Sequence, residues 1–181
     1  MYEQVSCSDT HCIGLADDGR AFTWSLTAAG TRFGQLCRLD RSLSSSPPTT
    51  PAAVTIGQRV VAVGAGGGRD AGHTVLVGQD GRVFACGCDR WQQLGVSAAT
   101  NDLSGNANGY TWRDGKLWQS APLPVPALAG VNVCQVALGT DHTLALAANG
   151  HDVYAWGKVR KQTVYAHDVH YSNLFPLLLM V

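Results

Sequence analysis

One short pattern occurs three times in this chain, and it restricts the possible folds more than any other feature. In each copy a histidine is followed by an apolar stretch, and a glycine stands eight residues after the histidine. The spacing inside each copy is fixed, whereas the distance between copies varies, which is typical of rigid units joined by loops. The aligned residues are His11 with Gly19, His73 with Gly81 and His142 with Gly150.

Each copy predicts a β-hairpin. An Asp-Gly or Asn-Gly pair separates two strand-like stretches, and such pairs tolerate the positive φ of a tight primed turn. The first stretch is apolar on both faces, so we expect neighbouring sheets to cover both, as in a β-propeller. The expected strands are residues 12–16 and 21–25, 74–78 and 83–87, and 143–147 and 153–157, with turns at Asp18-Gly19, Asp80-Gly81 and Asn149-Gly150.

The second strand of each hairpin contains one further aligned position. It lies two residues after an aromatic residue and is occupied by Trp24, Cys86 and Trp156. We predict that these three residues occupy equivalent, largely buried sites between or within blades, with Cys86 as the smallest member.

These copies resemble the regulator of chromosome condensation repeat. The pattern is G-x-x-H-T/S, an apolar strand, a D/N-G turn, V-aromatic-x-W-G and then G-Q-L-G. Here it reads "GTDHTLAL" and "NGHDVYAWG", "DAGHTVLVGQDGRVFACG" and "WQQLG", and, less closely, "SDTHCIGL", "DGRAFTWS" and "FGQL". The resemblance covers about residues 5 to 160 and implies blades of a seven-bladed β-propeller.

We therefore expect an all-β fold, a partial β-propeller of about three four-stranded antiparallel blades. The expected domain is residues 1–181, with repeats at about 5–59, 60–132 and 133–181 and an insertion at 97–121. Three departures from the pattern stand out: Cys86 replaces a tryptophan, Ser25 replaces a glycine, and "KVRKQ" follows the third hairpin.

The number of repeats raises the question of the missing blades. Seven blades at this period need roughly twice the present length, and an open arc of blades leaves unpaired edges and apolar faces. We expect a longer gene product, a partner or self-association to supply the remaining blades, and the isolated chain not to behave as a well-folded monomer.

Composition disfavours several classes of partner. The formal net charge is zero, which argues against direct nucleic-acid or chromatin binding. The longest apolar run, "LFPLLLMV", is too short to span a membrane.

No CxxC pair and no secretory signal are present, so we expect free, mostly buried thiols and an intracellular location, cytoplasmic or nuclear, with an organelle still open. The cysteines are Cys7, Cys12, Cys37, Cys86, Cys88 and Cys134.

Candidates for catalysis, metal binding or cofactor binding are weak. The repeat explains the three aligned histidines as structural hydrogen-bonding residues. His167, Asp168 and His170 cannot converge on a strand, although His167 and His170 would be neighbours on a helix. Gly66 and Gly68 resemble part of a dinucleotide fingerprint, but no helix follows, so we expect a flexible loop there. We predict no enzyme activity, no cofactor and no metal.

The insertion contains the best candidates for partner contact. Aromatic residues and an arginine are typical of interface hot spots, although these rings could equally pack on their own blade. The candidates are Tyr110, Trp112, Arg113 and Trp118. We interpret the chain as a protein-binding scaffold or recognition module. The alternative, implied by the resemblance, is a guanine nucleotide exchange factor, or part of one, for a small GTPase, although no exchange residue matches a position here.

Overall fold

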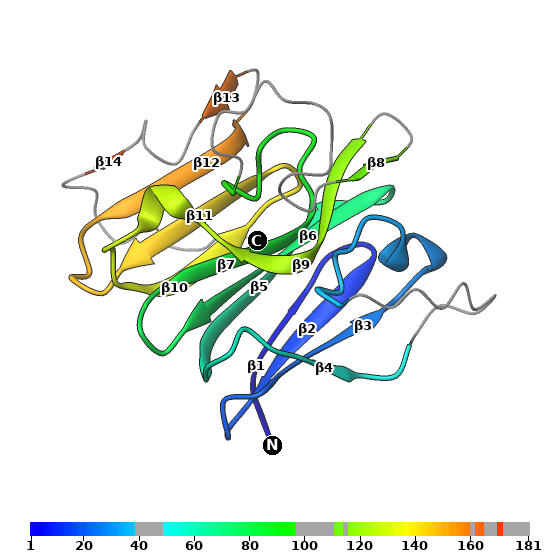
Figure 1. Cartoon of the computed structure of the whole chain (residues 1–181), viewed down its shortest axis with the longest axis horizontal. Helices are drawn as coiled ribbons and strands as arrows, with labels where there is room; N and C mark the ends of the chain where they lie inside the picture. The colour runs from blue at the N-terminus through cyan, green and yellow to red at the C-terminus, as the bar shows by residue number, and fades with distance from the viewer. Residues whose placement is uncertain (39–48, 97–110, 114–115, 160–161, 165–169, 172–181) are drawn as a thin grey trace.

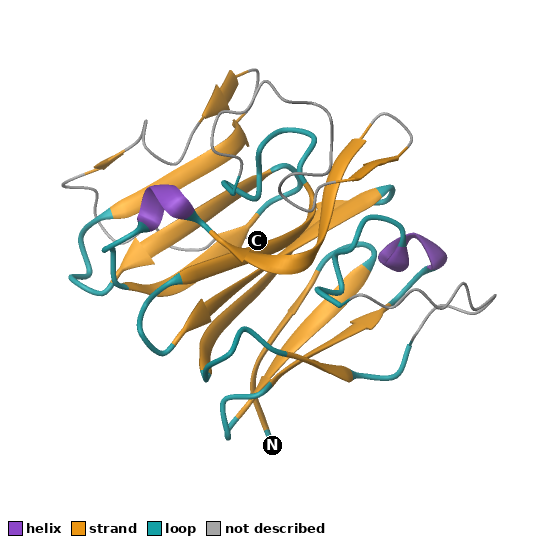
Figure 2. Ribbon diagram, viewed as in Figure 1, coloured by secondary structure: helices purple, strands orange, loops and turns teal. Residues whose placement is uncertain are grey.

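A computed structural model describes residues 1–38, 49–96, 111–113, 116–159, 162–164 and 170–171. These residues form three antiparallel sheets and two short 3-10 turns, η1 (Ala28–Thr31) and η2 (Pro126–Leu128). Figure 2 shows that strands dominate the described part of the chain. The all-β prediction is therefore confirmed.

The three sheets follow one another along the chain. The first has the order β1 (Tyr2–Cys7), β2 (His11–Ala16), β3 (Ala21–Ser25) and β4 (Ala52–Val54). The second has the order β5 (Val60–Gly68), β6 (Ala71–Gly78), β7 (Val83–Cys88), β9 (Lys116–Pro124) and β8 (Thr111–Arg113). The third contains β10 (Val133–Leu138), β11 (His142–Ala147), β12 (Val153–Val159) and β13 (Gln162–Val164), and β14 (His170–Tyr171) also pairs with β12. In Figure 1 they lie side by side, coloured blue, green and yellow to orange.

The three predicted hairpins are confirmed as β2–β3, β6–β7 and β11–β12. Their registers are equivalent. In each hairpin, the residue after the aligned histidine pairs with the position that is two residues after the aromatic residue of the second strand. These pairs are Cys12 with Trp24, Thr74 with Cys86 and Thr143 with Trp156. The repeat in the sequence is therefore a repeat in structure.

The class of turn differs from the prediction. Each turn glycine donates its amide to a carbonyl three residues earlier, as Gly19 does to Ala16 at 2.8 Å. Only the glycine has a positive φ, at 79° for Gly19, 78° for Gly81 and 75° for Gly150. A primed turn requires positive φ at one or both of its central residues, and the two residues before each glycine have none, so the turn is of the ordinary type, closed by a left-handed glycine.

This geometry makes Gly150 a sensitive position. A side chain there would meet no atom within 4 Å, so a substitution is strained only through the φ of 75°. We expect Gly150→Val to lower the free energy of unfolding by about 1–2 kcal/mol. Gly150→Asn is the control, because asparagine tolerates this conformation and should cost less. Equal urea midpoints for the wild type and both variants would contradict the assignment.

Two apolar clusters join the sheets. One includes Ile13 and Leu15 of the first sheet and Val63 and Leu76 of the second, while the other joins the second and third sheets around Trp156. The expected glycine-rich loop is wrong, because residues 64–68 belong to β5. A Cβ on Gly64 would lie 2.4 Å from Leu138 Cδ1, so this glycine allows β10 to pack closely on β5.

The expectation of free thiols is also corrected. Cys7 is bonded to Cys12 across β1 and β2, and Cys37 is bonded to Cys86 between the first and second sheets. Outside these disulfides, Cys88 is buried and Cys134 is exposed. Sequence spacing could not reveal the second pair, because its cysteines are 49 residues apart and meet only when the sheets stack.

Candidate interaction surface

The aligned histidines form a repeated polar link between sheets. His11 Nε2 lies 2.7 Å from Thr74 Oγ1, and that hydroxyl donates to the carbonyl oxygen of Gln35 at 2.7 Å. The same link recurs one sheet later, where His73 Nε2 lies 3.1 Å from Thr143 Oγ1, which donates to the Gln93 carbonyl at 2.8 Å. Each histidine thus joins its own sheet to the next.

The direction of these bonds places a proton on Nε2 of both histidines. Each threonine hydroxyl donates its proton to a glutamine carbonyl, so it accepts from the Nε2–H of the histidine. Burial lowers the pKa of His11 to about 4. Burial, followed by the nearby His11, lowers the pKa of His73 to about 3. Both rings are therefore neutral near pH 7 and serve as hydrogen-bond donors between sheets.

Within the described ranges, no three His, Cys, Asp or Glu side chains lie together as metal ligands would. The histidines His11, His73 and His142 lie at the start of three different strands, one in each sheet. Of the other candidate group, His167 and Asp168 lie outside the described residues, and His170 is on β14.

The outward face of the first sheet differs from its two counterparts. Val5, Val63 and Val136 occupy equivalent positions, since they pair with Gly14, Leu76 and Ala145 in the repeat register. Val63 is 1% exposed and Val136 is 7% exposed, because a preceding sheet packs on each. Val5 is 53% exposed. The same apolar position is therefore covered in two sheets and open in the first.

Aromatic residues lie on the same face as Val5, which pairs with Gly14, the partner of Phe22. The Tyr2 ring meets Phe22 edge-on at 6.0 Å and Trp24 at 6.2 Å between ring centroids. Tyr2 is 44% exposed, and Phe22 and Trp24 are half-buried. We call Tyr2, Val5, Phe22 and Trp24 the first-sheet face. Trp24 and Trp156 hold equivalent positions as predicted, but Trp24 is only partly buried, because no sheet precedes the first within the described residues.

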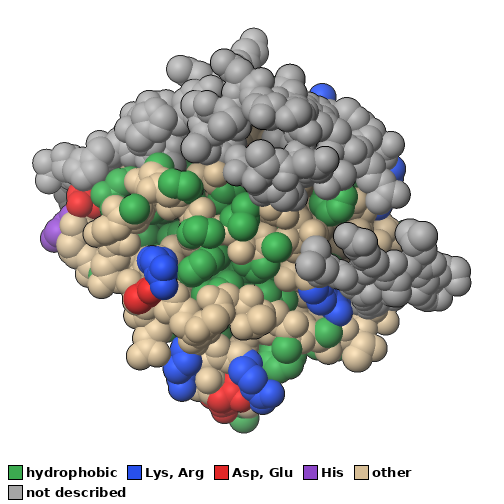
Figure 3. Space-filling model, viewed as in Figure 1, with side chains coloured by type: hydrophobic (Ala, Val, Ile, Leu, Met, Phe, Trp, Pro, Cys, Tyr) green, Lys and Arg blue, Asp and Glu red, His purple; other side chains and the backbone are tan. Residues whose placement is uncertain are grey.

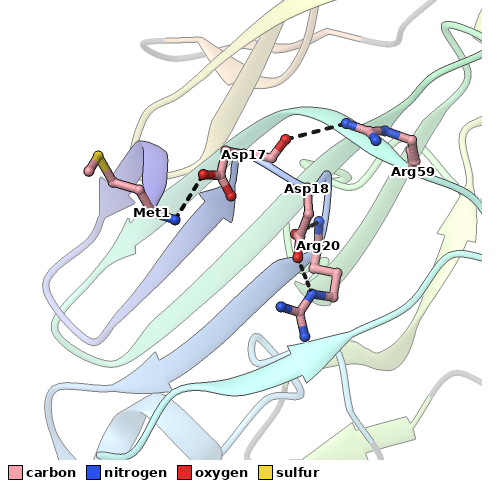
Figure 4. A network of polar contacts seen from close by, with 5 residues as sticks. All are labelled: Met1, Asp17, Asp18, Arg20 and Arg59. Atoms are coloured by element: carbon pink, nitrogen blue, oxygen red, sulfur yellow. Dashed lines mark hydrogen bonds and ion pairs between the residues drawn. The ribbon is translucent and has the colours of Figure 1, made fainter.

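An arginine borders the first-sheet face. The Arg20 guanidinium lies 5.4 Å from the centre of the Phe22 ring and donates to the Asp18 carboxylate at 2.6 Å. Figure 4 shows this pair beside Asp17, which accepts from the Met1 amine at 3.0 Å and, through its carbonyl, from Arg59. The Arg20 backbone amide, followed by its side chain, lowers the pKa of Asp18. These contacts hold the guanidinium over the aromatic ring.

The partner-contact residues predicted from the insertion are placed only in part. Tyr110 lies outside the described residues, and Trp112 and Arg113 lie on β8, which pairs with the first part of β9. Trp118 lies on β9 opposite Cys88, and its buried indole Nε1 has no hydrogen-bond partner among the residues that the structure describes. The first-sheet face was not predicted from the sequence, although the alignment of Val5 with Val63 and Val136 would have indicated it.

Charge is spread thinly over the described surface. On the face shown in Figure 3, blue and red side chains lie in small groups, often next to one another, and green side chains occupy the centre. In the described part of the chain, no helix is long and apolar enough to cross a membrane.

Comparison with known proteins agrees with the repeated geometry. Residues 80–146 match the family model for the regulator of chromosome condensation (RCC1) repeat. This segment contains the turn of the second hairpin and two members of the polar link between the second and third sheets, the Gln93 carbonyl and Thr143. Residues 80–146 of the chain are thus similar to an RCC1 repeat.

Relatives that carry RCC1 repeats are much longer than this chain. It is 29% identical over 154 residues to the human E3 ubiquitin-protein ligase HERC2, a match that covers 85% of this chain and 3% of HERC2. It is 27% identical over 156 residues to the guanine nucleotide exchange factor SRM1 of Saccharomyces cerevisiae, covering 84% and 29%. The ultraviolet-B receptor UVR8 of Arabidopsis thaliana is 27% identical over 157 residues, covering 86% and 30%. The chain therefore spans less than a third of each relative.

Solved structures show the same fold. The crystal structure of Prp20p from Saccharomyces cerevisiae aligns with a TM-score of 0.63 at 21% identity, covering 86% of this chain and 33% of Prp20p. Human WBSCR16 aligns with a TM-score of 0.64 at 22% identity, covering 97% and 40%. The three sheets of this chain thus form an arc of propeller blades.

Proposed function

We propose that this chain is a protein-binding module built from RCC1 repeats, and that the first-sheet face is a contact surface. The observation that carries the proposal is the exposure of Val5, at 53% against 1% and 7% for its two equivalents. Aromatic side chains with an adjacent arginine are the composition typical of interface hot spots.

The occupant that best fits the first-sheet face is another propeller blade. In the second and third sheets, the equivalent valines pack against the blade that precedes them. The surface is thus already adapted to a β-sheet that presents apolar residues. A longer gene product, a protein partner or a second copy of this chain would each supply such a sheet.

Contact with the first-sheet face would rest on apolar packing rather than on the polar link. Cys12 replaces the threonine found at Thr74 and Thr143, and it is bonded to Cys7. It therefore offers no hydroxyl to a histidine of a preceding blade.

The test compares two substitutions of the same kind. Val5→Asp places a charge on the first-sheet face, and Val61→Asp places one on β5 at a valine that is 46% exposed. We expect affinity capture with cross-linking to recover the same proteins with the wild type and with Val61→Asp. Val5→Asp should lose them, and the cross-links should map to residues 2–25. Partners retained equally by both variants would overturn the assignment of the surface.

The second candidate is an exchange factor for a small GTPase. SRM1 is named as a guanine nucleotide exchange factor, and the Prp20p structure was reported with its binding to Gsp1p and histones. Nucleotide release from a panel of purified small GTPases separates the two functions. An accelerated release would favour the exchange factor, whereas capture without release supports the binding module.

A further inference from the structure

Cys37 occupies the position of a repeat glycine. The loops "FGQLC" and "WQQLG" end at Cys37 and Gly95, which have left-handed φ values of 54° and 66°. The Cys37 amide donates to the Gly34 carbonyl at 2.9 Å, and the Gly95 amide donates to the Gln92 carbonyl at 3.1 Å. The two loops therefore have the same backbone, and their last residues are equivalent.

Cys86, in turn, occupies the position of a repeat tryptophan. It pairs with Thr74 as Trp156 pairs with Thr143. Trp156 Nε1 donates to the Gln93 carbonyl oxygen at 2.9 Å, and the Cys86 sulfur lies 3.9 Å from the equivalent oxygen of Gln35.

These two departures from the repeat compensate for each other. Between the second and third sheets, the glycine is needed, because a Cβ on Gly95 would lie 2.8 Å from Trp156 Nε1. Between the first and second sheets, the small Cys86 leaves room for the side chain of Cys37. Their Cα atoms are 5.5 Å apart, within the range of about 4.4–6.8 Å that a disulfide requires.

We infer that the Cys37–Cys86 pair is a reversible covalent link that replaces the glycine–tryptophan contact, so that its redox state sets how firmly the first sheet is held on the second. With the bond formed, the two sheets are tied across the interface. With the bond broken, two small thiols remain where the neighbouring interface has an indole ring, so packing is weaker.

The chemistry is thiol–disulfide exchange with a small-molecule or protein disulfide. One thiol loses its proton and attacks that disulfide, which releases one thiol of the oxidant and leaves a mixed disulfide with the protein. The second thiolate then attacks the protein sulfur of this mixed disulfide, forms the Cys37–Cys86 bond and releases the other thiol of the oxidant. The chain loses two electrons and two protons, and the oxidant leaves as two thiols. Cys86 is 0% exposed and Cys37 is 4% exposed, so exchange requires the interface to open. Cys7 is exposed, so exchange at the Cys7–Cys12 bond does not require the interface to open. This bond is therefore an internal reference for exchange at the buried Cys37–Cys86 pair.

The experiment measures thermal unfolding of the full chain with and without reductant. We expect the reduced wild type to unfold at a Tm about 6–12 °C lower than the oxidised form. C37G/C86W, made in a C7A/C12T background so that the other disulfide is absent, restores the pair found between the other two sheets and should unfold at the same Tm under both conditions. C7A/C12T inserts the residues of the second sheet at the other disulfide and should keep the redox shift.

Two further measurements complete the test. C37G/C86A in the same C7A/C12T background removes the bond without filling the space, so it should unfold near the reduced C7A/C12T chain under both conditions, even if C37G/C86W does not fold. Hydrogen exchange should rise in β1, β2 and β5 when the wild type is reduced. The inference would be overturned if the redox shift persisted in the variants that lack Cys37 and Cys86. It would also be overturned if reductant left the Tm of the wild type unchanged.

Discussion

Lowering the pH from 7 to 4 is expected to destabilise this chain by several kcal/mol. Burial lowers the pKa of His11 to about 4 and that of His73 to about 3, whereas an unfolded histidine titrates near about 6.5. Between these values the unfolded chain binds protons that the native chain does not, so the free energy of unfolding falls with decreasing pH. Each histidine accounts for roughly 3–5 kcal/mol of the free energy of unfolding. This stabilisation is fully present above pH 6.5 and is lost as the pH falls through the folded pKa.

Urea unfolding at a series of pH values measures this loss. The matched variant is His73→Asn, which removes the titrating ring at one of the two links. It should be less stable than the wild type at pH 7 and should lose less stability between pH 6.5 and 4. Equal slopes for the wild type and the variant would mean that His73 is not a buried neutral donor.

The second large effect is expected for Trp156→Ala. Trp156 is fully buried between the second and third sheets, and its indole donates to the Gln93 carbonyl. Removing the ring leaves a cavity and loses that hydrogen bond, so we expect a loss of about 3–5 kcal/mol in the free energy of unfolding. Chemical denaturation of the purified variant measures it.

Trp24→Ala is the control, because Trp24 holds the equivalent position in the first sheet and is only half-buried. Its truncation should cost clearly less than that of Trp156. A larger loss for Trp24 would mean that Trp24, and not Trp156, is the tryptophan packed between two sheets.

The hairpins could be predicted from sequence because their signals are local. A turn glycine, two apolar stretches and a fixed spacing specify each pair of strands, and the three copies support one another. The class of turn was mistaken because an Asp-Gly pair suits both a primed turn and an ordinary turn followed by a left-handed glycine.

The interaction surface depends on information that no single copy contains. Val5, Val63 and Val136 have similar surroundings in sequence, and only the presence or absence of a preceding sheet separates them. The Cys37–Cys86 bond has the same character, because its two halves look like unrelated departures from the repeat until the sheets are stacked. Non-local packing was therefore the part that sequence patterns did not supply.

Size-exclusion chromatography with light scattering on the purified chain tests the central claim most directly. In such a sample, further copies of the chain are the only blades available to cover the first-sheet face. We predict species larger than the 19.1 kDa monomer that grow with concentration, a shift toward the monomer for Val5→Asp, and no shift for Val61→Asp. A monodisperse 19.1 kDa species at every concentration, with cooperative unfolding, would contradict the claim that the open first-sheet face must be covered by another blade.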